Sequence, residues 1–235
     1  MKIVSWNCNG AFRKKRFALD EFDADVLVIQ ECENPGISSD LDYSAWATNY
    51  LWVGSVPYKG LGVFAKPELE LKQILLPPND FELFLPCKIG SDISMLAVWT
   101  QAGINREQGY IGQLWRYLQL NSSCLTEVNS ILIGDLNSNQ RWDKKRESGN
   151  HSQVVDYLEG IGLQSLYHSQ MTEAHGKEST PTFFMYRKLE RPYHIDYAFC
   201  SDAISKKSAR LEIASPEKWL VMSDHVPLTL HIDNC

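Results

Sequence analysis

Polar residues of the types that bind metals or move protons stand at the ends of several apolar runs. The groups are Asn7 with Asn9, Gln30 with Glu31, Asp135 with Asn137, His194 with Asp196, and Asp224 with His225. A single polar residue at a strand end is ordinary, because strands end at solvent. Five such groups in one chain instead favour hydrolysis of a phosphate ester, which needs a Lewis acid, a group that positions water and donors for the charge of the transition state.

The oxygen-bearing side chains among these residues suit a hard divalent cation. The carboxylates of Glu31 and Asp224 and the amide of Asn9 are ligands typical of Mg²⁺ or Mn²⁺ rather than of zinc. We therefore expect these three residues to hold a Mg²⁺ or Mn²⁺ ion.

The remaining groups can handle water and protons. Asp135 stands two residues before Asn137, so the pair can hold a water molecule between them. His225 can donate to a phosphate or carry a proton, with Asp196 orienting its ring. A structural histidine at the start of a strand is the competing interpretation for His225.

The elements that must position these residues are short strands mixed with a few helices. Apolar runs rich in β-branched residues predict strands, and apolar positions at helical spacing predict helices. The expected strands are 2–8, 26–31, 60–65, 69–75, 95–99, 130–135, 181–185, 193–200 and 226–232, and the expected helices are 13–22, 111–120 and 152–158. This mixture predicts an α/β protein with two packed sheets flanked by helices, and the absence of a linker or repeat predicts a single domain over residues 1–235.

Composition narrows the class of protein. The chain of 235 residues is 44% hydrophobic and carries a formal charge of −6, so it has no overall positive field to attract nucleic acid. The six cysteines form no CxxC pair, and we expect them to be reduced and mostly buried. No leader or membrane-spanning run is evident, which predicts a cytoplasmic protein without a membrane partner or an obligatory protein partner.

Five ordered motifs resemble those of the endonuclease/exonuclease/phosphatase superfamily. They are Ser5-Trp6-Asn7-Cys8-Asn9-Gly10, Ile29-Gln30-Glu31, Ile133-Gly134-Asp135-Leu136-Asn137, His194-Ile195-Asp196-Tyr197 and Ser223-Asp224-His225-Val226-Pro227-Leu228. The resemblance spans residues 3–231 and implies a four-layer α/β sandwich, two mixed β-sheets flanked by helices as in deoxyribonuclease I. One departure is Val98-Trp99-Thr100-Gln101, which stands where the exonuclease III branch has Tyr-x-Pro-Asn.

The same resemblance implies a role for each motif residue. The implied metal ligands are Glu31, Asn9 and Asp224; the implied water-handling residues are Asp135, Asn137 and Asn7; and the implied phosphate-binding pair is His225 with Asp196. The position of His194 is often Arg in the family, so we expect His194 to contact substrate.

Two basic clusters follow predicted catalytic strand ends. One is at 13–16 and the other, which includes an aromatic residue, is at 141–146. They could hold the backbone of a polyanion, with Trp142 as a stacking surface, although solvated loop charges would look the same. The expected substrate-binding residues are therefore His194, Arg141, Trp142, Lys144, Lys145 and Arg146.

Together these features predict a divalent-metal-dependent phosphodiesterase. The expected substrate is nucleic acid, DNA before RNA. The alternatives are a phosphomonoesterase or a phospholipid or inositol phosphate phosphoesterase of the same fold, and a nucleic-acid-binding domain without catalysis. His151, His168 and His175 carry no assigned chemistry: we expect His151 beside a helix cap and the other two in loops or at the surface.

Overall fold

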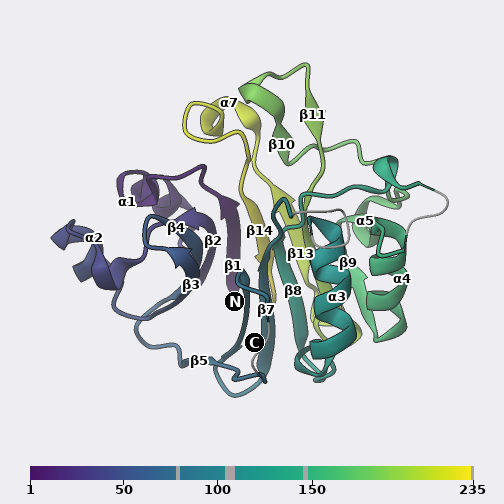
Figure 1. Cartoon of the computed structure of the whole chain (residues 1–235), viewed down its shortest axis with the longest axis horizontal. Helices are drawn as coiled ribbons and strands as arrows, with labels where there is room; N and C mark the ends of the chain where they lie inside the picture. Colours follow the sequence, from purple (N-terminus) through teal and green to yellow (C-terminus); the bar gives the residue numbers. More distant parts are fainter. Residues whose placement is uncertain (78–79, 104–108, 145–147, 234–235) are drawn as a thin grey trace.

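The computed structural model describes residues 1–77, 80–103, 109–144 and 148–233. In these ranges the strands form two six-stranded sheets and one two-stranded sheet (Figure 1). The first sheet has the order β13 (Arg210–Ile213), β14 (Leu228–His231), β1 (Lys2–Asn7), β2 (Val26–Cys32), β4 (Lys59–Ala65), β3 (Tyr50–Val56). The second has the order β5 (Leu71–Gln73), β6 (Phe84–Ile89), β7 (Ile93–Trp99), β8 (Ser130–Asp135), β12 (Asp196–Ser201), β9 (Leu163–Ser165), and the small sheet pairs β10 (Phe183–Phe184) with β11 (Pro192–Tyr193).

Both large sheets are mixed, and in each one the parallel pair lies among antiparallel neighbours. β1 pairs in parallel with β2 and antiparallel with β14, while β7 pairs in parallel with β8 and β8 antiparallel with β12. β1 therefore lies between β2 and β14, and the N-terminal amino group of Met1 donates to the carbonyl of Ile232 at 2.6 Å.

Helices cover the outer faces of the two sheets. The α-helices are α1 (Phe12–Lys15), α2 (Leu41–Trp46), α3 (Ile111–Asn121), α4 (His151–Gly160), α5 (Leu166–Met171), α6 (Asp202–Ser205) and α7 (Pro216–Trp219). The 3₁₀ turns are η1 (Arg16–Phe22), η2 (Pro35–Ile37), η4 (Ser122–Leu125), η5 (Gln140–Trp142) and η6 (Met185–Arg187). Figure 1 shows α3 and α4 on one side of the molecule and α1 and α2 on the other, so the expected layers of helix, sheet, sheet and helix are confirmed.

The alternation of side chains along each strand determines what faces the space between the sheets. In β1, Ile3 packs into the core between the sheets, whereas Val4 and Trp6 pack outward against the helical layer. In β8, Ile131 and Ile133 face the same inner core. By the same alternation, the last residues of these strands, Asn7 and Asp135, point toward each other at one end of the core.

Two backbone features shape the strand ends. The pairing of β2 with β4 shifts register between Gln30 and Cys32, so Glu31 is an extra residue with a φ of 63°. Gly134 has a φ of 145°, and a Cβ atom there would lie 2.0 Å from the carbonyl oxygen of Val98. A bulge changes the direction of the side chain it carries, which here is the carboxylate of Glu31. A glycine allows close approach of two backbones, and Gly134 directly precedes Asp135.

Most expected elements are present, but one expected helix and one expected strand differ, and β3, β6, β9 and β13 were not expected. The segment expected as a helix at 13–22 is one short turn of α-helix followed by the 3₁₀ turn η1, and Ala11 before it has a φ of 54°. The strand expected at 193–200 is divided into β11 and β12, and helix α4 begins with a capping box made by Asn150 and Gln153. In the described part of the chain, no helix is long and apolar enough to cross a membrane.

Candidate active site

Three predicted residues form a hydrogen-bonded group around Asp135. The Nδ2 atom of Asn7 donates to Oδ2 of Asp135 at 2.9 Å, and the Nδ2 atom of Asn137 donates to the same oxygen at 3.0 Å. The backbone N–H of Asn137 donates to Oδ1 at 2.8 Å. Asn137 can reach both oxygens because its φ is 45°, which turns the chain back on the carboxylate. Asp135, with a fully buried side chain, is therefore fixed from several directions.

A second group pairs His225 with Asp196. The Nδ1 atom of His225 lies 2.9 and 3.1 Å from the two carboxylate oxygens of Asp196. Two further contacts fix the segment that carries the histidine: the Trp6 indole N–H donates to the His225 carbonyl, and the Ser223 hydroxyl donates to the Asn7 carbonyl. The Phe183 ring packs 4.7 Å from the imidazole.

The two groups meet at Asp135 and His225. The Nε2 atom of His225 lies 3.9 Å from Oδ2 of Asp135, and Asp196 is the direct partner of Asp135 in the pairing of β8 with β12. Burial, followed by the charge of Asp196, raises the pKa of Asp135 from 3.8 to about 7. Burial disfavours a charged His225 ring, but the carboxylates of Asp196 and Asp135 outweigh it and raise the pKa of His225 to about 10.

The expected metal ligands lie at the adjoining strand ends. The Nδ2 atom of Asn9 donates to Oδ1 of Asp224 at 2.9 Å, and Asn9 is held by a bond from its N–H to Oδ1 of Asn7. Glu31 is paired with Lys59 instead, whose ammonium lies 3.2 Å from its Oε2 atom. The three residues offer carboxylate and amide oxygens, which is the donor set that a hard divalent ion takes.

Sequence reasoning missed two contributors beside Glu31 and Asn137. Lys59 pairs with Glu31, and its ammonium also lies 5.3 Å from the ring centroid of Trp99. The backbone carbonyl of Thr100 accepts from Nδ2 of Asn137 at 3.0 Å. Neither carries a motif: Lys59 is a lone lysine at the start of β4, and a backbone carbonyl has no sequence signal.

A cleft of about 720 Å³ adjoins the site at Asn137. It is lined by Tyr110, Arg141, Trp142 and Lys144, among other residues. Trp142 is 43% exposed and packs 5.4 Å from Tyr193, with the Arg141 guanidinium 5.7 Å from the same ring. Of the predicted substrate-binding residues, Arg141, Trp142 and Lys144 thus line one surface, while Lys145 and Arg146 lie outside the described residues.

Two expectations about substrate contacts do not fit the structure. His194 is 3% exposed, and its Nδ1 atom lies 2.7 Å from the Thr180 carbonyl, so the ring is turned into the protein and cannot meet a substrate. The first basic cluster is largely occupied by internal contacts: Arg13 pairs with Glu33, the buried Arg16 donates to the Arg13 carbonyl, and Lys15 donates to the Cys8 carbonyl.

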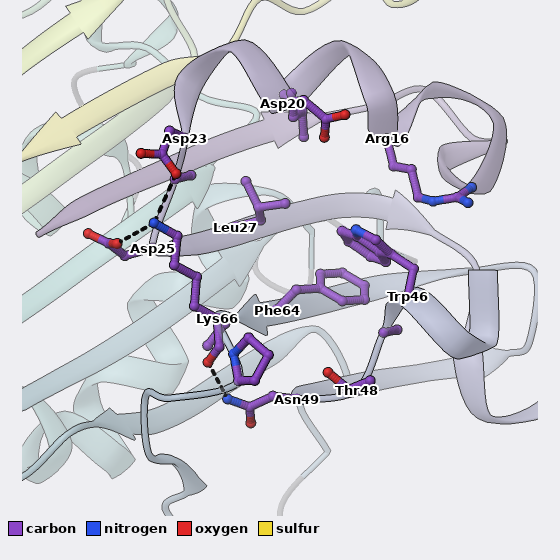
Figure 2. A pocket seen from close by; sticks show the side chains of 15 residues that line it. Arg16, Asp20, Asp23, Asp25, Leu27, Trp46, Thr48, Asn49, Phe64 and Lys66 are labelled. Carbon is purple, nitrogen blue, oxygen red and sulfur yellow. Dashed lines mark hydrogen bonds and ion pairs between the residues drawn. The ribbon is translucent and has the colours of Figure 1, made fainter. Parts of the chain in front are cut away.

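A separate cavity of about 390 Å³ lies on the outer side of the first sheet. Figure 2 shows it between η1 and the segment around Trp46, with Lys66 bonded to Asp23 and Asp25. None of the residues described above for the two hydrogen-bonded groups lines it. The cavity is therefore separate from the candidate active site.

Comparisons with known proteins agree with this geometry. The model of the Endonuclease/Exonuclease/phosphatase family matches residues 4–225. An exodeoxyribonuclease of Bacillus subtilis (strain 168) is 25% identical over 262 residues, covering 99% of this chain and 100% of the relative.

Two solved structures share the fold. A 3′-5′ exonuclease from Neisseria meningitidis has a TM-score of 0.73 at 17% identity, covering 99% of this chain and 100% of the other. A 3′ phosphatase from Neisseria bound to a product DNA hairpin has a TM-score of 0.71 at 18% identity, covering 99% of both chains.

Proposed function

Because this chain belongs to the endonuclease/exonuclease/phosphatase family of phosphoric ester hydrolases, we propose that it is a divalent-metal-dependent nuclease that hydrolyses phosphodiester bonds of DNA. The observation that carries the proposal is the pairing of a proton acceptor with a proton donor across a gap. Asp135 is held by Asn7 and Asn137, and the Nε2 atom of His225 faces it at 3.9 Å.

The proposed roles follow from these contacts. Asp135 takes the proton of the attacking water, which Asn137 orients, and Asn7 keeps the carboxylate in place. His225 donates from Nε2 to a phosphoryl oxygen, while Asp196 holds the opposite nitrogen and stabilises the positive ring. Glu31, Asn9 and Asp224 would hold Mg²⁺ or Mn²⁺, which supplies a Lewis acid for the phosphoryl oxygens.

The cleft beside Asn137 supports a substrate larger than a phosphate monoester. Its volume is about 720 Å³, and Trp142 and Tyr193 offer aromatic rings next to Arg141, a combination that suits an unpaired base and its backbone phosphate. The Bacillus subtilis relative is named for DNA, which supports DNA over RNA. The cysteines described as free and buried support work in a reducing compartment such as the cytoplasm.

A cleavage panel tests the proposal. Labelled single- and double-stranded DNA, RNA, inositol phosphates and sphingomyelin are incubated with the protein in Mg²⁺, in Mn²⁺ and in chelator, beside an Asp135→Asn protein prepared in parallel. We expect metal-dependent cleavage of DNA by the unaltered protein alone. Faster turnover of inositol phosphates or sphingomyelin than of any DNA would instead identify the protein as a phospholipid or inositol phosphate phosphoesterase.

A further inference from the structure

Four of the six histidines gather in a second cluster beneath the strand end that carries Asp196. His151 begins α4, His168 lies in α5, His175 follows α5 and His194 precedes β12. The rings of His168 and His175 stack with centroids 3.5 Å apart, while His151 lies 5.6 Å from His175 and His194 lies 6.1 Å from His168. His175 lies in a turn, as expected, but His168 lies in α5, and both belong to this cluster.

The chain after α5 turns sharply to bring a carboxylate into this cluster. Thr172 ends the helix with a φ of 57°, and Gly176 has a φ of 81° in the turn closed by the bond from the N–H of Lys177 to the carbonyl of Ala174. Glu178 then reaches back to His168, with its Oε1 atom 3.1 Å from Nε2. Their side chains are only 4% and 9% exposed.

The potential ligand atoms of this cluster converge. One from each of His168, His175 and Glu178 lie within 4.8 Å of one another. Zinc binds imidazole nitrogen and carboxylate oxygen at roughly 2.0–2.2 Å, so small rotations of these side chains would place all three around one ion.

Unpartnered nitrogens in the same cluster point to a missing ligand. Nδ1 of His175, Nε2 of His151 and Nε2 of His194 are buried, and none has a hydrogen-bond partner among the described residues. His151 and His194 are only 1% and 3% exposed. Buried polar atoms are nearly always paired, so three unpaired imidazole nitrogens in one cluster call for a binding partner.

The tautomer of His194 leaves the correct nitrogen available. Its Nδ1 atom lies 2.7 Å from the Thr180 carbonyl, which can only accept, so Nδ1 carries the proton and Nε2 keeps its lone pair. A backbone carbonyl that holds one ring nitrogen is the usual support for a histidine that binds metal through the other.

We propose that this cluster is a zinc site, bound by His168, His175 and Glu178, with Nε2 of His194 or of His151 in the fourth position. Imidazole donors favour zinc over Mg²⁺ or Mn²⁺, which select oxygen, so the site differs in chemistry from the one at Glu31. Four protein ligands in a buried setting are typical of a structural zinc ion rather than a catalytic one.

A bound zinc ion would link the loop after β8, which carries Asn137, to the start of β12, which carries Asp196. The Nδ2 atom of Asn139, two residues after Asn137, donates to Oε2 of Glu178 at 3.0 Å and to the His194 carbonyl at 2.9 Å. His194 in turn stands two residues before Asp196. An ion bound to Glu178 would therefore stiffen both the loop after β8 and the start of β12.

Metal content tests the proposal directly. Protein produced with zinc is dialysed against a mild chelator, and its metals are measured by mass spectrometry. We expect about one zinc per chain in the unaltered protein, in Glu31→Gln and in the matched control His231→Gln, whose histidine lies outside the cluster. We expect the zinc to be absent from the double variant His168→Gln with His175→Gln.

Two measurements on the unaltered protein keep the test decisive if the double variant does not fold. Stripping zinc with a strong chelator should lower Tm, and stoichiometric zinc should restore it. Cobalt in place of zinc should give the intense visible absorption of a four-coordinate site. The proposal would be overturned if the protein took up neither zinc nor cobalt and neither ion changed its Tm. Full zinc content in the folded double variant would also overturn it, as would absence of the zinc from Glu31→Gln.

Discussion

Asp135 and Asp196 stand directly opposite each other on antiparallel strands, so two buried carboxylates share one end of the core. His225 lies between them, with Nδ1 at Asp196 and Nε2 facing Asp135. The charge of Asp196 acts on both partners in the same sense: it raises the pKa of Asp135 and raises the pKa of His225. The titrations of Asp135 and His225 are therefore coupled.

The pH dependence of cleavage should show this coupling. Activity needs Asp135 without its proton and His225 with its proton, so the rate should rise with pH through the raised pKa of Asp135 and fall through the raised pKa of His225. Asp196→Asn removes a negative charge from both, so both limbs of the profile should move to lower pH. The measurement is kcat/KM against pH at saturating Mg²⁺; an acid limb that stays in place in the variant would contradict the coupling.

Removing the water-handling pair should affect turnover more than binding. Asp135→Asn should lower kcat by roughly 10²-fold or more, as expected when a positioned base is removed. DNA affinity, measured by fluorescence anisotropy, should stay near that of the unaltered protein. Asn137→Ala should also lower kcat, because it removes a donor to Asp135. Near-normal turnover of the Asp135→Asn variant would show that Asp135 does not take the proton of the attacking water.

Metal binding should depend on Glu31. Glu31→Gln should weaken Mn²⁺ affinity by at least ~10-fold, since even the outer partners of metal ligands are worth this much. The measurement is calorimetric titration with Mn²⁺, and the exposed Glu68 provides the matched control as Glu68→Gln. Equal Mn²⁺ affinity in the Glu31 and Glu68 variants would assign the ion to other residues.

Lys59 should compete with the ion for Glu31. Its ammonium lies 3.2 Å from the carboxylate, so Lys59→Met should lower the Mg²⁺ concentration needed for half-maximal activity by up to about fivefold, the limit for an exposed pair worth about 1 kcal/mol. The measurement is a Mg²⁺ titration of initial rate. A higher Mg²⁺ requirement in the variant would show that the lysine supports metal binding instead.

Salt dependence should reveal binding to a nucleic-acid backbone. Replacing Lys144, Lys145 and Arg146 with Ala in the Asp135→Asn background should flatten the plot of log affinity against log salt by about one unit for each phosphate that the protein no longer neutralises. The control removes three charges away from the cleft, at Lys72, Lys206 and Lys207. Equal slopes for the two triple variants would show that residues 144–146 do not contact the backbone of the nucleic acid.

Residue alternation explains how far the site could be predicted. Asn7 and Asp135 end strands in which every second residue faces the inner core, so their meeting follows from strand parity and the motif order. Alternation does not extend to His194: the even-numbered Ala198 and Cys200 of β12 face the inner core, but His194 lies outside that strand. His194 precedes that strand and turns toward Thr180, which no alternation specifies.

Other features depend on contacts between distant segments and carry no local signal. The pairing of Glu31 with Lys59 requires the bulge in β2 and its register with β4. The stacking of His168 on His175 requires the left-handed turn at Thr172, a residue with no special preference for that conformation. The basic run at 13–16 was proposed to hold a polyanion, with solvated charges as the alternative, but Arg13 pairs with Glu33, which directly follows β2.

The position of β1 between β2 and β14 has a consequence for synthesis of the protein on the ribosome. A nascent chain carries Asn7, Glu31 and Asp135 long before it carries Asp224 and His225, and β1 lacks its neighbour β14 until residues 228–231 have been made. Contacts that span most of the chain form slowly, and here one of them, from Trp6 to His225, closes the site itself. The proposed site is thus incomplete in any nascent chain that has not yet reached His225.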